Sequence, residues 1–435
     1  MALKKYRFLL VALLFASIIE VVFYPGFMSF DTIHALVSAR EGVTESHWPP
    51  MVSYIWWVID SLTGNPAAMH FTQNFILMAS SSYILQSQLA KRTLPSALLV
   101  IITFFTPALV GTVVVIWKDV LTASLFFLSI ALTIWMKDKK SPRASIRTAQ
   151  FLLILIVLFL AISAAIPLYA WSSSVFLSGF TIARFRKTTV ILLALSLSMA
   201  SYSGKIFLDN YSLPSLKPFA SNADFSRPVQ QLNALDYVVC SGSGALMEAN
   251  PNLSSDYVAS IYDPRNIDLN QELTSKIPSD FDLEKFLRDA YISNPYCGLH
   301  QKANMAIFLL GMNEGYQYLI TSPGIHTNPY GLELGPNAFR DFWVMLIILG
   351  SYVPVLRPWV LLLISSALMA VYFRKHNRLP STVLVLSTSG AFYFAGLVVL
   401  GISSDARLAF FTHMCNLLIS ILLFVQLRSK RAKLD

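Results

Sequence analysis

Long apolar segments constrain this chain more than any other feature of its sequence. Windows of about 17 to 25 apolar residues mark helices that span a bilayer. Ten such windows are present, at residues 8–24, 67–90, 95–116, 120–136, 148–166, 168–183, 188–207, 358–373, 380–402 and 407–427. Charged residues make up only 13% of the chain, against roughly 25% in soluble domains. We therefore predict an all-α polytopic membrane protein with about ten transmembrane helices.

The distribution of lysine and arginine predicts how these spans are oriented. Six short segments hold 20 of the 33 basic residues: 1–7, 91–92, 137–147, 184–187, 374–378 and 428–435. With ten spans all six fall on one side, which the positive-inside rule makes the cytoplasm, together with both termini. We expect a bacterial inner (cytoplasmic) membrane protein. The net charge of +9 then reflects these loops and does not indicate a nucleic-acid partner.

This topology divides the chain into three regions. Residues 1–207 form an N-terminal module of seven spans, whose first outer loop is 25–66. Residues 208–339 form a small outer domain of α or α+β type, and residues 340–435 form a C-terminal module of three spans. The outer domain holds 14 acidic and 7 basic residues, a net charge of about −7.

The apolar stretch 341–356 is a further candidate span. It contains Pro354 and is followed by Pro358. If it crossed the bilayer, the basic loop at 374–378 would lie outside. We therefore predict an interfacial or re-entrant helix here.

Cys240 and Cys297 both lie in the outer domain, whereas Cys415 lies in the last window. Two cysteines on the oxidising side of a membrane indicate a disulfide. Two unpaired buried thiols are the alternative. The sequence has no metal-ligand cluster of cysteine and histidine, no nucleotide-binding glycine-rich loop and no G-x-S-x-G element.

The first outer loop gathers more polar residues than a membrane-facing loop requires. Asp31 opens the segment DTIHALVSAR, where it can cap a short helix that ends at Gly42, and His34 lies one turn further on. The segment MVSYIWWVIDSL is too short to cross. We predict two interfacial helices that hold Asp31 above the bilayer edge, with helix capping alone as the alternative role for Asp31.

Two further charged pairs are predicted at the same outer surface. Lys118 and Asp119 end the third window, and Asp405 and Arg407 precede the tenth. Ionisable residues near a membrane are functional candidates. The alternative for Lys118 and Asp119 is interfacial anchoring beside Trp117.

This arrangement resembles the GT-C superfamily of polyprenyl-phosphate-sugar-dependent integral membrane glycosyltransferases. The shared pattern is an aspartate in the first outer loop, then a histidine and Pro-Pro, W-K-D at the third span, a large late outer domain and D-x-R before the last span. In this chain Trp48 separates His47 from Pro49 and Pro50, where relatives usually have the histidine directly before the prolines.

The resemblance implies that Asp31 is the catalytic base and that Asp119 is a second functional acid. It implies contacts to the donor phosphate for Lys118 and Arg407. The other substrate-binding residues that we expect are His34, His47 and Asp405. The donor would be a lipid-linked sugar and the acceptor an envelope glycan, lipid or protein; a divalent metal is neither required nor excluded.

The residue chemistry is compatible with such a transfer. Displacement of a lipid phosphate at the anomeric carbon needs a carboxylate that takes the acceptor's proton and cations that neutralise the leaving phosphate. A single carboxylate acting directly favours inversion. The competing hypothesis is a transporter or flippase for a lipid or anionic solute, which would place charges near the midplane and show repeats. A purely structural role is supported by the outer domain alone.

Overall fold

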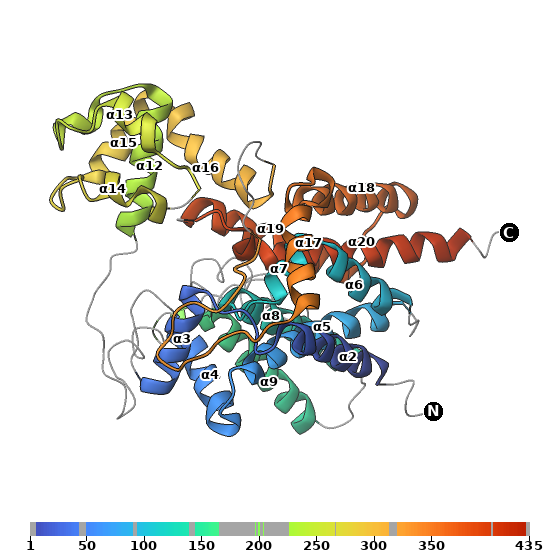
Figure 1. The fold of residues 1–435 in the computed structure, drawn as a ribbon. Coiled ribbons are helices and arrows are strands. Elements are labelled where there is room, and N and C mark those ends of the chain that lie inside the picture. The colour runs from blue at the N-terminus through green and yellow to red at the C-terminus, as the bar shows by residue number, and fades with distance from the viewer. Residues whose placement is uncertain are drawn as a thin grey trace.

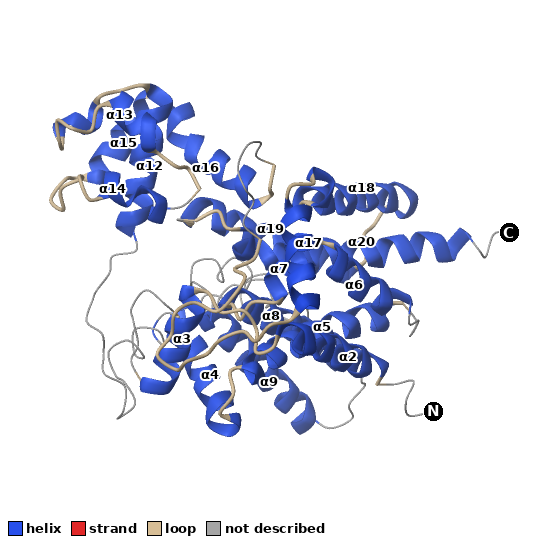
Figure 2. Cartoon of the chain, viewed as in Figure 1, coloured by secondary structure: helices blue, strands red, loops and turns tan. Residues whose placement is uncertain are grey.

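The computed structural model describes residues 6–42, 49–89, 94–138, 144–164, 226–265, 267–312, 320–401 and 403–431, with a few isolated residues between 196 and 203. Helices make up 78% of the structure, and the described residues contain no strand, as Figure 2 shows. The α alternative for the outer domain is therefore the one found in its described part. The predicted spans at 168–183 and 188–207 lie almost entirely outside the described residues.

Four described helices are long and apolar enough to cross a bilayer. They cover Lys118–Met136, Pro358–His376, Ser381–Leu400 and Ala406–Arg428. A bent helix pair, Pro95–Phe105 with Pro107–Val113, makes a fifth candidate if it is counted as one span. The membrane character of the chain is thus supported by the structure, whereas the count of ten spans stays a prediction.

The N-terminal module is a bundle built around α5. Its helices are α2 (Arg7–Phe23), α5 (Ala67–Gln88), α8 (Lys118–Asp138) and α9 (Ala144–Ala164). Helix α5 lies between α2 and α8, and α8 also packs on α9. Buried polar residues line α5, including His70, Gln73 and Asn74. This explains why α5 has the length of a span but not the apolar composition of one.

The predicted third span is wrong as a continuous helix. The chain bends by 89° between α6 (Leu94–Phe105) and α7 (Pro107–Val113). Pro107 excludes a helical conformation at Thr106, whose backbone is extended, and lacks the N–H that would continue the helix. Residues 114–117 then form a loop, so Lys118 and Asp119 begin α8 and do not end the third span.

The first outer loop contains the two short helices predicted from the sequence. Helix α3 (Phe30–Glu41) ends at Gly42 with φ of +69°, and α4 (Pro50–Thr63) ends at Gly64 with φ of +63°. Both glycines adopt the left-handed conformation that terminates helices. With 12 and 14 residues, neither helix can cross a bilayer.

The C-terminal module packs on the bend of α6 and α7. Its elements are α17 (Ala338–Ser351), η3 (Pro354–Leu356), α18 (Pro358–His376), α19 (Ser381–Leu400), η4 (Ala406–Ala409) and α20 (Phe410–Arg431). A Cβ atom at Gly350 of α17 would lie 2.4 Å from Cγ of Pro107, so the close packing of α17 against α7 requires a glycine there. Helix α17 has 14 residues and is too short to span, as expected for the interfacial or re-entrant helix.

The outer domain is a compact set of helices that projects from the membrane modules in Figure 1. It comprises α12 (Ser226–Ser241), η1 (Ala245–Glu248), α13 (Ser255–Ile261), η2 (Ile267–Asn270), α14 (Gln271–Thr274), α15 (Leu283–Ser293) and α16 (Pro295–Leu309). Helices α12, η1, α13, α14 and α15 share a separate apolar core, whereas Met305 and Leu309 of α16 belong to the main core of the chain. The predicted disulfide between Cys240 and Cys297 is present, with the two Cα atoms 5.4 Å apart, and it joins α12 to α16.

Residues 320–337 return from the outer domain across the first outer loop. Met28 N donates to Gly324 O at 3.0 Å, and His326 N donates to Met28 O at 2.8 Å. On its other side, Phe27 N donates to Val114 O at 3.0 Å. The extended residues before α3 are therefore held between two distant segments of the chain.

Candidate functional site

Asp31 and Arg407 form an ion pair at one end of the helix bundle. The Arg407 Nη2 atom lies 2.6 Å from Asp31 Oδ2. The two side chains are 18% and 23% exposed, so solvent screens this pair less than it screens a surface pair. Asp31 lies in the first turn of α3 and Arg407 lies in η4, separated by nearly the whole chain.

Arg407 makes two further contacts that fix its guanidinium group. Nη2 lies 3.4 Å from Asp405 Oδ2, and the guanidinium carbon lies 4.8 Å from the ring centre of Trp117. An aromatic face attracts a cation without occupying its N–H groups. Arg407 can therefore stack on Trp117 and still present N–H donors to an anion.

A chain of hydrogen bonds ties the Trp117 loop to the start of α3. Trp117 Nε1 donates to Ser29 Oγ at 2.9 Å, and Ser29 Oγ lies 3.1 Å from Thr32 Oγ1. The buried Thr32 hydroxyl donates to Ile116 O at 2.7 Å. These bonds hold the segment before Lys118 against the helix that carries Asp31.

Asp119 is the most buried charged residue of the site, with 6% exposure. Its Oδ2 atom has no hydrogen-bond partner among the described residues. Asp119 and Lys118 occupy the first turn of α8, where a carboxylate interacts favourably with the helix dipole. The site thus holds a second carboxylate whose hydrogen-bonding capacity is only partly used.

Asp31, Lys118 and Arg407 line a pocket with an apolar wall. Its cavity volume is about 20 Å³, roughly the space of a single water molecule, so a larger ligand enters only if the surrounding side chains move apart. Its lining consists of Asp31, Thr32, Ala35, Pro49, Val52, Ser53, Trp56, Met69, Ile116, Trp117, Lys118 and Arg407. One end therefore presents two cations and a carboxylate, and the remainder is apolar and aromatic.

Polar side chains of α5 bind the backbone of the loop that precedes Trp117. His70 Nε2 lies 3.0 Å from Val113 O, Asn74 Nδ2 donates to the same carbonyl at 3.0 Å, and Gln73 Nε2 donates to Val115 O at 2.9 Å. His70 Nδ1 in turn lies 2.8 Å from Glu20 Oε2. A break in a helix at membrane depth leaves carbonyls without intrahelical donors, and these side chains supply them.

A second ion pair lies beside the site. Arg40 binds Asp60 through two bonds of 2.8 and 2.9 Å, linking α3 to α4, and its guanidinium stacks on Tyr330 at 4.6 Å. Burial raises the pKa of Tyr330 to about 12, with Glu41 adding to the shift. Tyr330 therefore stays protonated and donates to Glu41 Oε1 at 3.2 Å. This pair is not part of the pocket lining.

The outer domain contacts the loop that carries Asp405 and Arg407. Ser404 N and Oγ both donate to Arg265 O, at 2.7 and 2.8 Å. Ser404 is one residue from Asp405. The outer domain thus helps to position the site.

The structure brings together five of the residues predicted for the site: Asp31, Lys118, Asp119, Asp405 and Arg407. The ring of His34 packs on Phe30 with centroids 4.2 Å apart and is not among the residues that line the pocket, so its role in substrate binding stays a prediction. His47 lies outside the described residues. The predicted cap is also wrong: Ser29 is the N-cap of α3, and Asp31 lies within its first turn.

Sequence reasoning missed Ser29, Thr32 and the α5 side chains His70, Gln73 and Asn74. The signal for α5 was available, because a window with this many amides, hydroxyls and a histidine is too polar for a lipid-facing span. Nothing in the local sequence indicated that Thr32 would contact Ile116, 84 residues away.

No group of three or more His, Cys, Asp or Glu side chains within the described residues is arranged to hold a metal ion. No protein-family model matches the chain, and comparisons with curated proteins and with solved structures give no match either. The arrangement of the site's own residues is therefore what indicates the function.

Proposed function

We propose that this protein is a membrane glycosyltransferase that takes a sugar from a polyprenyl-phosphate donor and passes it to an envelope glycan, lipid or protein on the outer face. The observation that supports this most is the Asp31–Arg407 pair, with its 2.6 Å contact, beside Lys118 in a pocket with an apolar wall. The pocket offers a base and two cations where a lipid phosphate and a hydroxyl acceptor would meet.

In this proposal the cations bind the donor phosphate. Arg407 presents planar N–H donors that can bind phosphate oxygens in pairs, and Lys118 adds a second charge. As the bond from the anomeric carbon to the phosphate oxygen breaks, the negative charge that develops on that oxygen is stabilised by both.

Asp31 would take the proton of the acceptor hydroxyl. In the structure its Oδ2 atom contacts Arg407. A phosphate would compete with Asp31 for that guanidinium, so donor binding would release the carboxylate next to the anomeric carbon. This ordering couples donor binding to activation of the acceptor. Direct attack of the hydroxyl with one base gives inversion at the anomeric carbon.

Asp119 would have a positioning role. Its carboxylate is buried beside Lys118 and is close enough to Arg407 and Asp31 to interact with both electrostatically. A buried carboxylate there can orient both cations toward the phosphate.

A transporter or flippase is the second candidate, and the bent α6–α7 pair favours it. Broken helices next to buried polar residues are typical of transporter binding sites. Here, however, the polar α5 side chains bind the carbonyls at the break, and the ionisable residues of the pocket lie at helix ends.

The test uses a deletion strain in which the missing envelope sugar is identified by mass spectrometry. Asp31→Asn should lower sugar transfer by a factor of about 100 or more, because the shape is kept and the base is lost. Arg407→Ala should raise the donor concentration needed for half-maximal transfer. Transfer is measured with the purified protein in nanodiscs and radiolabelled donor.

Asp60→Asn is the matched control, because it disrupts the other Asp–Arg pair of α3 and leaves the pocket lining unchanged. It should retain near wild-type transfer at equal expression. Near wild-type transfer by Asp31→Asn would exclude the catalytic-base role. A deletion strain with an intact envelope and loss of solute or lipid movement would favour the transporter.

A further inference from the structure

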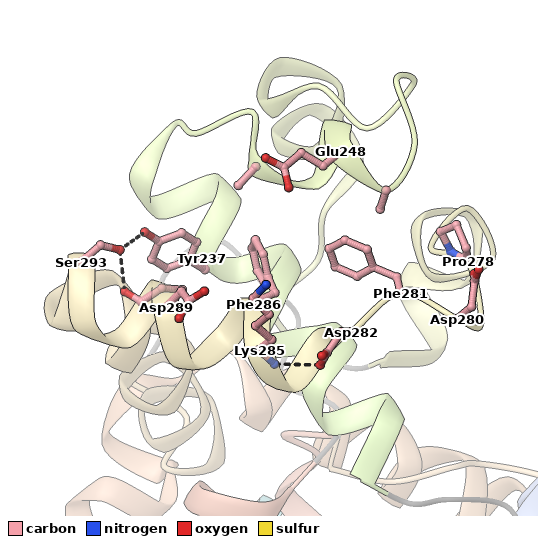
Figure 3. A pocket seen from close by; sticks show the side chains of 13 residues that line it. Tyr237, Glu248, Pro278, Asp280, Phe281, Asp282, Lys285, Phe286, Asp289 and Ser293 are labelled. Atoms are coloured by element: carbon pink, nitrogen blue, oxygen red, sulfur yellow. Dashed lines mark hydrogen bonds between the residues drawn. The ribbon is translucent and has the colours of Figure 1, made fainter.

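The outer domain contains a second, larger groove, made entirely of its own residues (Figure 3). It lies between the segment around η1, the loop before α15 and one face of α15. Its volume is about 680 Å³. This lies within the roughly 300–1,000 Å³ typical of small-molecule sites. The groove therefore admits a short ligand of a few units.

Aromatic rings form the apolar part of the groove. Tyr237 and Phe286 meet edge to face with centroids 6.0 Å apart, and Phe281 lies 5.9 Å from Phe286. Phe281 and Phe286 also pack on the core of the domain, so the rings are fixed in place. In Figure 3 the two phenylalanine rings lie between Glu248 on one wall and Lys285 on the other.

Charged residues surround these rings. Glu248, Asp280 and Asp289 are exposed carboxylates of the lining, and Lys285 is its one basic residue. Asp282 also lines the groove, but its Oδ1 accepts from Lys285 N at 2.9 Å and so caps α15. The lining carries a net charge of −3, since it holds four carboxylates and one ammonium group. An anionic ligand is disfavoured by this charge.

We propose that this groove binds a saccharide chain whose rings are neutral or carry amino groups. Sugar hydroxyls both donate and accept hydrogen bonds, and the lining offers matching groups. The carboxylates accept and Lys285 donates. The Tyr237 and Ser293 hydroxyls, 3.2 Å apart, can do either. The C–H faces of sugar rings fit the electron-rich faces of the aromatic side chains.

A basic peptide is the competing ligand, because it would also satisfy the acidic residues. Its cationic side chains, however, would face the ammonium of Lys285, which stands one helical turn from Asp289 on the same side of α15. A saccharide uses Lys285 as a donor. The proposal does not depend on sugar transfer at Asp31, since binding can occur with or without chemistry there.

The binding test uses the full chain in phosphatidylcholine nanodiscs, because maltoside detergents carry sugar headgroups that would compete. Calorimetry and saturation-transfer NMR are run with four probes: chitotetraose, its deacetylated amine form, tetragalacturonate and tetralysine. We expect binding of the first two and none of tetragalacturonate. Binding of tetralysine without either saccharide would overturn the proposal in favour of a peptide, and binding of no probe would overturn it altogether.

Variants connect the binding to this groove. Asp280→Asn with Asp289→Asn should weaken saccharide binding about tenfold or more, because two charge-assisted hydrogen bonds are lost. Glu248→Gln, on the opposite wall of the groove, should also weaken saccharide binding. Glu284→Gln is the matched control, an exposed acid on α15 outside the lining. Equal affinity of the double variant and the wild type would refute the proposal, whereas Asp31→Asn should bind saccharide as the wild type does.

Discussion

Individual side chains in this protein perform tasks that their neighbours in sequence do not reveal. Arg407 illustrates this, because it stacks its face on Trp117 while its edge meets Asp31 and Asp405. Lysine could not replace it, since an ammonium group has neither a flat face nor a planar fork of donors. The geometry of the site thus depends on an arginine at this position.

Lys302 of α16 is the second residue whose surroundings are unusual. Its Nζ atom is buried and has no hydrogen-bond partner in the described part of the chain. Burial lowers its pKa to about 8 from the ordinary 10.5, and Asp236 opposes the shift. Below pH 8 the native protein therefore holds a desolvated charge.

Lys302→Met should raise the thermal midpoint of the outer domain at pH 7. The expected gain is on the order of 2 kcal/mol, because one pKa unit corresponds to about 1.4 kcal/mol and partial exposure reduces the effect. Between about pH 8 and 10.5 the unfolded wild-type chain binds more protons at Lys302 than the native chain does. Wild-type stability should therefore rise with pH across this window, and the advantage of the variant should shrink.

Scanning calorimetry of the full chain in nanodiscs at pH 7, 8, 9 and 10 measures this effect. Lys285→Met, which removes an exposed lysine of the same domain, serves as the control and should show no such pH dependence. A constant difference between wild type and Lys302→Met at all four pH values would contradict the assignment.

At the scale of elements, apolar windows predicted the long helices, because hydropathy reports the lengths of α18, α19 and α20 directly. Hydropathy predicted a continuous helix at 95–116, which is wrong, because hydropathy averaged over a window does not register the bend at Pro107. The charged residues of the site could be chosen from the sequence, since charge is rare in such a chain. The contacts of these residues could not be predicted from the sequence, because the pairing of Asp31 with Arg407 depends on how distant helices pack.

The bend between α6 and α7 is the element on which the site depends most. Gln73→Leu should remove one of the two donors to the Val115 carbonyl, which also accepts from Trp117 N at 3.0 Å, at a cost of about 0.5–1.5 kcal/mol. Because Val115 lies two residues before Trp117, sugar transfer should fall with stability. Thermal stability and transfer are measured on the same preparations.

Gln86→Leu is the matched control for Gln73→Leu. It removes a buried amide of the same helix that donates to Ser96 Oγ at 3.0 Å and does not contact the bend. It should cost comparable stability and leave transfer per folded molecule unchanged. Equal transfer per folded molecule for both variants would show that the α5 side chains do not position the site.

At the scale of the whole molecule, the candidate site and the basic segments lie at opposite ends of several helices. Helices α2, α8, α19 and α20 each have one end at the candidate site and the other at a basic segment. In Figure 1 the first residues of α2 and the last residues of α20 lie on one side, and the outer domain lies on the opposite side. The distribution of charge along the sequence therefore corresponds to one direction in the structure, from the candidate site to the helix ends that adjoin basic segments.

This direction predicts the orientation of the protein in the membrane. Arg378→Cys, in the basic connection between α18 and α19, should react with a membrane-impermeant maleimide only after the cells are opened. Ser260→Cys, exposed on α13 of the outer domain, should react in intact spheroplasts. The native cysteines should react little with the maleimide, because Cys240 and Cys297 are paired and Cys415 is buried. Reaction of both residues from the same side would exclude the proposed orientation and, with it, an outer-facing site at Asp31.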